Sequence, residues 1–219
     1  TTIMTNEKEF DHALSLYQKS LGIGIHLNLT WGNSLLTGKP FHKWNKYKAA
    51  LGIINKDFVE KEFQKQIEKL LEVGIRPDHL DSHQHLHAFQ PLTDIMIKLA
   101  QEYHIYKIRW PKEKHTLVLP NMSFINQKII NASLKKCPLK TTDHFFGILH
   151  TGNPQLKHFL SYLDFEGSAE ICCHPGKKTS KGKDKLWKTR EKELNILTNE
   201  NFLKTIKEKN IQLITFKEL

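Results

Sequence analysis

Short apolar segments typical of β-strands alternate along this chain with longer segments that have the periodicity of amphipathic helices. Because a repeated β-then-α order leads to parallel strands joined by helical crossovers, the alternation predicts an α/β fold with a parallel sheet or a (β/α) barrel. The expected strands are residues 21–30, 79–83, 106–110, 144–149, 169–173 and 211–216. The expected helices run from Asn6 to Tyr17, from Asp57 to Gly74, and over 91–103, 124–136, 154–163, 188–196 and 199–208, with loops at 31–50 and 177–186.

The length of 219 residues allows one sizeable core, and we expect a single domain over residues 1–219. The 39% hydrophobic and 26% charged residues fit a folded globular protein. No apolar run is long enough to span a bilayer, and the first residues do not resemble a signal peptide. Cys137, Cys172 and Cys173 make an odd count, and the last two are adjacent, which predicts a reduced, cytoplasmic protein.

A formal net charge of +10 at pH 7 makes nucleic acid one partner to consider. The lysines, however, are interleaved with glutamates, as at residues 191–193 and 207–209, and this pattern is typical of a solvated surface. Nucleic acid is therefore disfavoured as a partner, and a membrane is not expected. The sequence leaves a homodimer open.

The segment His79-Leu-Asp-Ser-His-Gln-His-Leu-His87 places four imidazoles and one carboxylate within nine residues. In a strand, His79, Asp81 and His83 would point to the same face. If the chain turns helical after Asp81, His83 and His87 become an i, i+4 pair that could share a metal ion. Imidazole is a common metal ligand, and a carboxylate can ligate the metal or orient a ligating His, so the cluster favours a metal site over a solvated His-rich turn.

Two further segments end in histidines that could face the same cleft. In residues 21–30 apolar side chains alternate with polar ones, and His26 lies on the polar face. The apolar segment 169–173 ends in His174-Pro175-Gly176. Because the chemistry of α/β barrels lies where strands end, His26, His83, Arg109 and His174 are the candidate site residues.

Three motifs resemble those of the YdjC-like carbohydrate deacetylases, which include chitooligosaccharide deacetylases. They are Gly-Ile-His-Leu-Asn-Leu-Thr at 24–30, the His motif at 79–87 and Cys-His-Pro-Gly at 173–176. The resemblance implies a distorted, TIM-like (β/α) barrel of the polysaccharide deacetylase type. It also implies that His26 and His83 bind a metal, usually written as magnesium, and that His174 is the catalytic acid or base.

Members of that family begin with a strand that ends in Asp-Asp-Phe-Gly, and these carboxylates supply a metal ligand and a base. Here residues 1–6, Thr-Thr-Ile-Met-Thr-Asn, resemble the family's second strand. We therefore expect the family's first strand and helix to be missing from these 219 residues. Metal affinity and deacetylation would then need a preceding strand that ends in Asp-Asp.

The resemblance implies a metal-dependent hydrolase that removes an acetyl group from a small N-acetylated carbohydrate. Asp81 would orient a ligating His, and Arg109 could hold the base or bind the oxyanion. Trp31, Trp44 and Trp110 could stack on sugar rings, although single tryptophans are more often core residues. The donor types also suit zinc or another transition metal. The alternatives are another metal-dependent hydrolase that acts on a (phospho)sugar, and a catalytically inactive barrel.

Overall fold

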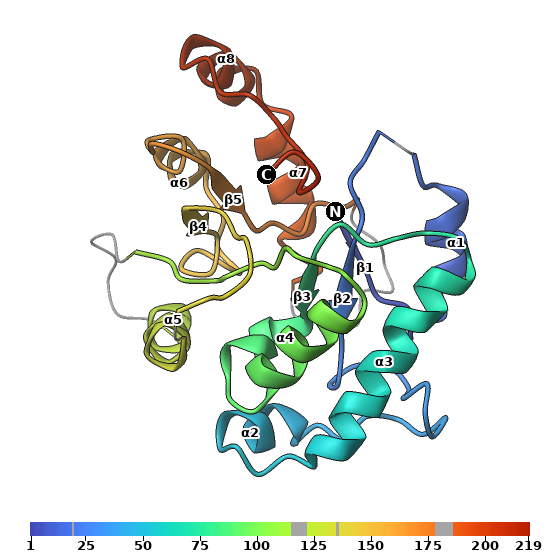
Figure 1. The fold of residues 1–219 in the computed structure, drawn as a ribbon. Coiled ribbons are helices and arrows are strands. Elements are labelled where there is room, and N and C mark those ends of the chain that lie inside the picture. The colour runs from blue at the N-terminus through green and yellow to red at the C-terminus, as the bar shows by residue number, and fades with distance from the viewer. Residues whose placement is uncertain (19, 115–121, 135, 178–185) are drawn as a thin grey trace. The chain divides into compact units, whose positions relative to one another are not determined.

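A computed structural model describes residues 1–18, 20–114, 122–134, 136–177 and 186–219, and shows an α/β fold with parallel strands (Figure 1). The contacts divide the chain into two compact units. Unit 1 comprises Thr1–Trp110, Ser133–Thr141 and Ile214–Leu219, and unit 2 comprises Pro111–Ala132 and Thr142–Leu213. The α/β class is therefore confirmed, and the single-domain organisation stays a prediction.

Unit 1 contains a three-stranded parallel sheet with the order β1 (Thr2–Ile3), β2 (Gly24–Leu27) and β3 (Leu80–Ser82). Its register pairs His26 with Asp81. The expected strand at 106–110 is reduced to single parallel bridges, from Leu80 to Ile108 and from Lys107 to Lys140. The sheet thus brings β2 and the His motif side by side.

The helices at Lys56–Glu72 and Leu92–Glu102 each bury one face, as their sequence periodicity predicts. The expected loop at 31–50 is wrong in part, because Asn45–Ala50 forms a helix. Helix α3 contacts both β2 and α4 (Figure 1). Its buried stripe of Val59, Phe63, Ile67 and Leu70 is fully excluded from solvent, and each such side chain stabilises the fold by roughly 1.5–3 kcal/mol. The elements are α1 (Phe10–Ser15), α2 (Asn45–Ala50), α3 (Lys56–Glu72), the 3-10 helix η1 (His83–Ala88) and α4 (Leu92–Glu102).

Two expected helix starts, at Asp57 and at Asn6, are wrong. The first helix is capped by a residue before Asp57, and the second begins after Asn6 because a loop binds the Asn6 side chain. Asn55, rather than Asp57, caps α3, and its side-chain oxygen accepts a hydrogen bond from the Phe58 N–H at 3.0 Å. Asn6 does not cap α1. Its amide instead donates to the carbonyls of Trp31 (3.0 Å) and Asn33 (3.1 Å) and so holds the loop after β2.

Unit 2 is built on a two-stranded parallel sheet of β4 (His144–Phe146) and β5 (Ala169–Ile171). Its helices are α5 (Met122–Ser133), α6 (Leu156–Ser161), α7 (Arg190–Leu197) and α8 (Glu200–Glu208). One cluster of buried apolar side chains joins α6, α7 and α8, and consists of Phe159, Tyr162, Leu163, Ile196, Phe202 and Ile206. The buried Glu113 carboxylate accepts backbone N–H bonds from residues 147, 148 and 149, each at 3.0 Å.

The expected last strand, residues 211–216, is wrong: this described segment has no strand pairing. A turn forms there instead, and the Glu218 carboxylate accepts a hydrogen bond from the Thr215 N–H at 2.7 Å. The Phe216 ring stacks on His79, with ring centroids 3.8 Å apart. Most of the expected loop at 177–186 lies outside the described residues. In the part of the chain that the structure describes, no helix is both long and apolar enough to cross a bilayer.

The stability of the protein is expected to fall as the pH drops from about 6.5 toward 4, in part because of His150 in unit 2. The His150 and His158 rings stack at 3.6 Å, and His150 Nδ1 lies 2.5 Å from the Tyr162 hydroxyl. Burial, His158 and Lys157 lower the pKa of His150 from 6.5 to about 4. The unfolded chain therefore takes up the proton first on acidification, which favours unfolding.

Urea unfolding at a series of pH values checks this expectation. A His150→Phe variant should be less stable overall but should lose less stability between pH 7 and 5 than the unaltered protein. The matched control is His12→Phe, because His12 is exposed on α1. An unchanged pH dependence in His150→Phe would contradict the assignment.

Candidate metal and catalytic site

The paired strands β2 and β3 bring His26 and Asp81 together in unit 1. The two residues are directly opposite in the parallel register, so their side chains leave the sheet on the same face. His26 Nδ1 lies 2.7 Å from Asp81 Oδ1. Since an ionised carboxylate can only accept, the imidazole proton lies on Nδ1, and Nε2 carries the lone pair that could bind a metal.

Asp81 is an ionised carboxylate with both oxygens engaged. Its side chain is fully buried, and Arg109 Nη1 donates to the oxygen that His26 does not use. Burial alone would raise the pKa of Asp81, but the charge of Arg109 and the hydrogen bond from His26 hold it well below its ordinary value. Asp81 therefore fixes His26 and Arg109 in place.

His83 follows β3 directly and lies beside His26. Thr30 Oγ1 is 2.8 Å from His83 Nδ1, and the His26 and His83 ring centroids are 5.8 Å apart at an interplanar angle of 66°. Both rings are thus oriented through Nδ1, one by a carboxylate and one by a hydroxyl. This is the arrangement in which second partners set the direction of metal-binding imidazoles.

The two imidazoles fit as two ligands of a metal ion rather than as a complete protein ligand set. A ring nitrogen binds zinc at about 2.0–2.1 Å, which places two ring centroids on one metal at roughly the separation seen here. Among the described residues, no group of three or more His, Cys, Asp or Glu side chains is arranged to hold a metal ion.

Two other histidines of the motif, His79 and His87, have structural partners. His79 Nδ1 lies 2.5 Å from Asp78 Oδ1. His87 is fully buried, with Nδ1 2.7 Å from Ser82 Oγ and Nε2 2.9 Å from the Arg109 carbonyl oxygen. Burial lowers the pKa of His87 to about 4. The predicted pairing of His83 with His87 is not formed, because Gln84 and His85 between them adopt left-handed conformations (φ 57° and 54°).

His174 lies in unit 2, after β5, next to a buried carboxylate. Its backbone N–H donates to Glu193 on α7, and its Nδ1 is 4.0 Å from Glu193 Oε2. Burial raises the pKa of Glu193, although the bond from the His174 N–H opposes that rise. The His174 side chain is 37% exposed, so the ring can reach solvent. A histidine beside a carboxylate is a pairing suited to proton transfer.

The structure changes the list of sugar-facing aromatic residues and adds polar partners. Trp110 is buried, with 8% of its surface exposed, which is the core role that single tryptophans more often have. Trp31 and Trp44 are exposed. The sequence alone does not reveal the contacts of Thr30 and Glu193, although Thr30 ends the motif at 24–30 and Glu193 lies on α7.

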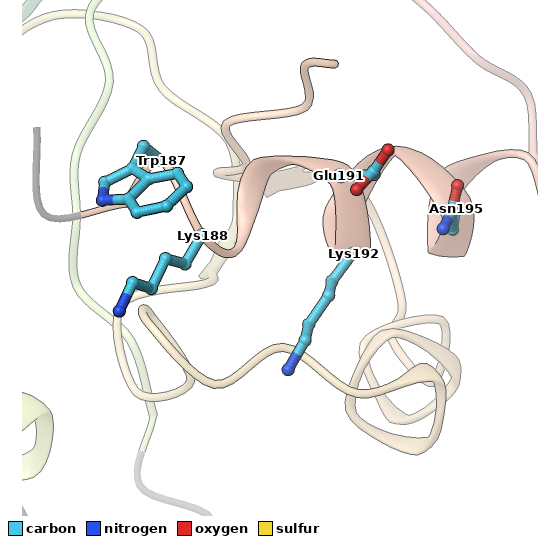
Figure 2. Close-up of a pocket in the computed structure, with 5 residues that line it drawn as sticks. All are labelled: Trp187, Lys188, Glu191, Lys192 and Asn195. Atoms are coloured by element: carbon cyan, nitrogen blue, oxygen red, sulfur yellow. The ribbon is translucent and has the colours of Figure 1, made fainter. Parts of the chain in front are cut away.

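Unit 2 also carries a pocket of about 370 Å³ along α7. It is lined by Trp187, Lys188, Glu191, Lys192 and Asn195, and Figure 2 shows both lysine side chains extending to the same side of the helix. None of the predicted site residues lines it.

Comparisons with known proteins agree on one family. The family described as YdjC-like protein matches residues 1–208. A carbohydrate deacetylase of Clostridium beijerinckii is 32% identical over 100% of this chain and 87% of its own length. A carbohydrate deacetylase of Brevibacillus brevis is 27% identical, with the same coverage of both chains.

A solved structure from Enterococcus faecalis superimposes with a TM-score of 0.75 at 21% identity, covering 100% of this chain and 86% of that one. That protein is named, as a provisional assignment, for cleavage of cellobiose phosphate. At 21% identity the structural likeness supports the fold alone. The family match over residues 1–208 is a match of sequence, and it supports membership of the family. This chain belongs to the YdjC-like family.

Proposed function

We propose that this protein is a metal-dependent hydrolase that removes the acetyl group from N-acetylated sugars such as chitooligosaccharides. The observation that carries the proposal is the cluster of His26, Asp81, Arg109 and His83 at the ends of β2 and β3. Carboxyl ends of parallel strands are where α/β proteins bind their ligands. The relatives named carbohydrate deacetylase supply the substrate class.

His26 and His83 would hold the metal through Nε2. When bound, a divalent ion supplies Lewis-acid polarisation of the acetamide carbonyl and lowers the pKa of water. The ion is magnesium by family likeness, while two imidazoles favour a transition metal by donor type.

Of the remaining residues, Asp81 and Arg109 would position a metal ligand, and His174 would transfer a proton. Asp81 holds the Nδ1 proton of His26 and keeps the ring aimed, and Arg109 holds Asp81 in turn. Because both oxygens of Asp81 are engaged, we assign it a positioning role. His174 would donate a proton to the leaving amine, with the Glu193 carboxylate 4.0 Å from its Nδ1.

We further propose that the complete fold is a distorted (β/α) barrel in a single domain, and that the protein is cytoplasmic. The parallel pairing in both sheets and the repeated β-then-α order support the barrel. All three cysteines are free thiols, which supports a reduced compartment.

Acetate release from N,N′-diacetylchitobiose tests the proposed activity. A chelator should abolish release, and adding back magnesium, manganese or zinc separately should restore it and identify the metal. Release of inorganic phosphate from a phosphorylated disaccharide, without acetate release from any acetylated sugar, would favour the alternative hydrolase.

Replacing His26 or His83 with alanine is expected to abolish binding of one divalent ion in a calorimetric titration, since each variant removes one of the two imidazole ligands. Acetate release should fall with it. The matched control, His12→Ala, removes an exposed imidazole of the same unit and should change neither. Unchanged metal affinity in both single variants would overturn the ligand assignment.

A further inference from the structure

A buried histidine joins the end of the His motif to Arg109. His87 has no exposed surface, and its Nε2 lies 2.9 Å from the Arg109 carbonyl oxygen. Since a carbonyl oxygen can only accept a hydrogen bond, Nε2 must carry a proton and donate. The His87 ring therefore holds the backbone of the residue whose guanidinium binds Asp81.

The second ring nitrogen of His87 is paired as well. Nδ1 lies 2.7 Å from the Ser82 hydroxyl oxygen, and the same oxygen accepts the His87 backbone N–H at 2.9 Å. Burial is the largest cause that lowers the pKa of His87 to about 4, so the ring is neutral at pH 7. With its one proton on Nε2, Nδ1 accepts a hydrogen bond from the Ser82 hydroxyl. The contacts thus select a single tautomer of His87, with the proton on Nε2.

The bond from His87 lies where the backbone of Arg109 has little support from strand pairing. In the described chain, residues 106–110 pair with β3 through a single bridge, from Leu80 to Ile108. The Arg109 N–H donates to the Leu80 carbonyl at 3.0 Å, and the Arg109 carbonyl accepts from His87. Both backbone polar groups of Arg109 are therefore paired, one with β3 and one with an imidazole. The imidazole supplies the second of the two bonds that fix the direction of the Arg109 side chain.

The Arg109 side chain connects this buried histidine to a proposed metal ligand. Its Nη1 donates to Asp81, and the other oxygen of Asp81 lies 2.7 Å from His26 Nδ1. Arg109 and His26 thus share one fully buried carboxylate. A displacement of about 1 Å at a positioning group can lower a rate by about 100-fold. A shift of the Arg109 backbone would therefore change the position of Asp81 and, with it, of the His26 ring.

We propose that His87 is a positioning residue whose Nε2–H, through Arg109 and Asp81, keeps the His26 ring aimed for metal binding. The inference rests on the proposed function, in which His26 binds the metal, and extends that site to an imidazole that would itself bind neither metal nor substrate. The successive contacts from His87 to Arg109, to Asp81 and to His26 carry it. Ser82 is part of the link, because its hydroxyl leaves Nε2 as the nitrogen that carries the proton.

Long-range proton–nitrogen correlation spectra of the metal-free protein at pH 7 test this inference, because they report which ring nitrogen of each histidine carries the proton. The unaltered protein is expected to show His87 protonated on Nε2 and His26 protonated on Nδ1. In His87→Phe, the His26 signal should move toward a mixture of the two tautomers, and the affinity for a divalent metal should fall about tenfold or more. The kcat for acetate release should fall in the same proportion, with KM changed by less than about threefold.

Two amide variants separate the bond to Arg109 from the bond to Ser82. The side chain in His87→Gln places its amide nitrogen near the position of Nε2 and can still donate to the Arg109 carbonyl, so it should restore the His26 signal and most of kcat. The shorter amide of His87→Asn reaches only the position of Nδ1 and should not. The matched control for lost packing is Met96→Ala, which shortens another fully buried side chain of unit 1, on α4. It should lower the unfolding midpoint but leave the His26 signal and the metal affinity unchanged.

The outcomes separate the positioning role from the proposed function. If His87→Phe, like Met96→Ala, loses stability but keeps the His26 signal and the metal affinity, the inference is wrong. It is also wrong if the unaltered protein carries the His87 proton on Nδ1, or if His87→Gln recovers no more kcat than His87→Asn, a comparison that decides even where His87→Phe fails to fold. If the His26 signal and metal affinity respond as expected but the unaltered protein releases no acetate, the positioning role stands and the proposed reaction is wrong. If the unaltered protein binds no divalent ion, both are overturned.

Discussion

Replacing Asp81 with alanine is expected to lower the free energy of unfolding by about 3–5 kcal/mol, the cost of leaving a buried charge without its partner. The Asp81 side chain is fully buried, and Arg109 and His26, at 11% and 19% exposure, would lose their common acceptor. Acetate release should fall by about 10–100-fold, because the orienting partner of a ligating histidine is lost. Urea unfolding followed by circular dichroism measures the first effect, and steady-state kinetics the second.

Asp81→Asn separates the two roles of this carboxylate. The amide oxygen can still accept from Arg109, so part of the stability should return. The amide N–H₂ would then face His26 Nδ1 and force the ring proton onto Nε2, the nitrogen assigned to the metal. Metal affinity should therefore stay low while stability recovers. Normal metal affinity in Asp81→Asn would show that the carboxylate does not set the His26 tautomer.

Replacing Glu62 with alanine is expected to cost about 3–5 kcal/mol of stability, comparable to the loss at Asp81, because several buried donors would lose a charged acceptor. Glu62 lies on α3 with no exposed surface. It accepts from the Ser34 hydroxyl at 2.6 Å, from the Leu35 and Leu36 N–H groups at 3.0 Å, and from Gln66 Nε2 at 2.8 Å. The loop that carries Trp31 should loosen as a result.

Chemical denaturation of Glu62→Ala, of the near-isosteric Glu62→Gln and of Lys61→Ala checks this effect. Lys61 is the exposed neighbour on the same helix and should be within about 0.5 kcal/mol of the unaltered protein. Glu62→Gln should lie between the other two, since it keeps one acceptor. A loss below about 1 kcal/mol in Glu62→Ala would mean that the loop hydrogen bonds are replaced by water.

The sequence predicts the neighbourhood of His26 and Asp81 well, because local pattern and topology agree there. Alternation over 21–30 places His26 on a polar face, and the β-then-α order makes the next strand a parallel neighbour. The pairing found in the register follows from these two facts. The buried stripe of α3 is likewise visible as a helical repeat.

Other parts of the site depend on contacts that no local pattern encodes. Gln84 and His85 take left-handed conformations without any glycine to signal the turn, so the run of alternate histidines reads as regular structure. Asn6 has the spacing of a helix cap, yet the loop after β2 recruits it. No local sequence pattern around Trp110 distinguishes a buried tryptophan from an exposed one, and only the packing of the folded chain shows that it is buried.

Residues 214–219 belong to unit 1, although in the chain they follow residues 142–213, which belong to unit 2. Phe216 covers His79, and Lys107 Nζ donates to the carbonyls of Phe216 (2.5 Å) and Lys217 (2.8 Å). During synthesis the ribosome must therefore finish unit 2 before the last contacts of unit 1 can form. Until then His79 and the neighbouring strand residues remain uncovered, and nascent chains would be most prone to misassociation in that interval.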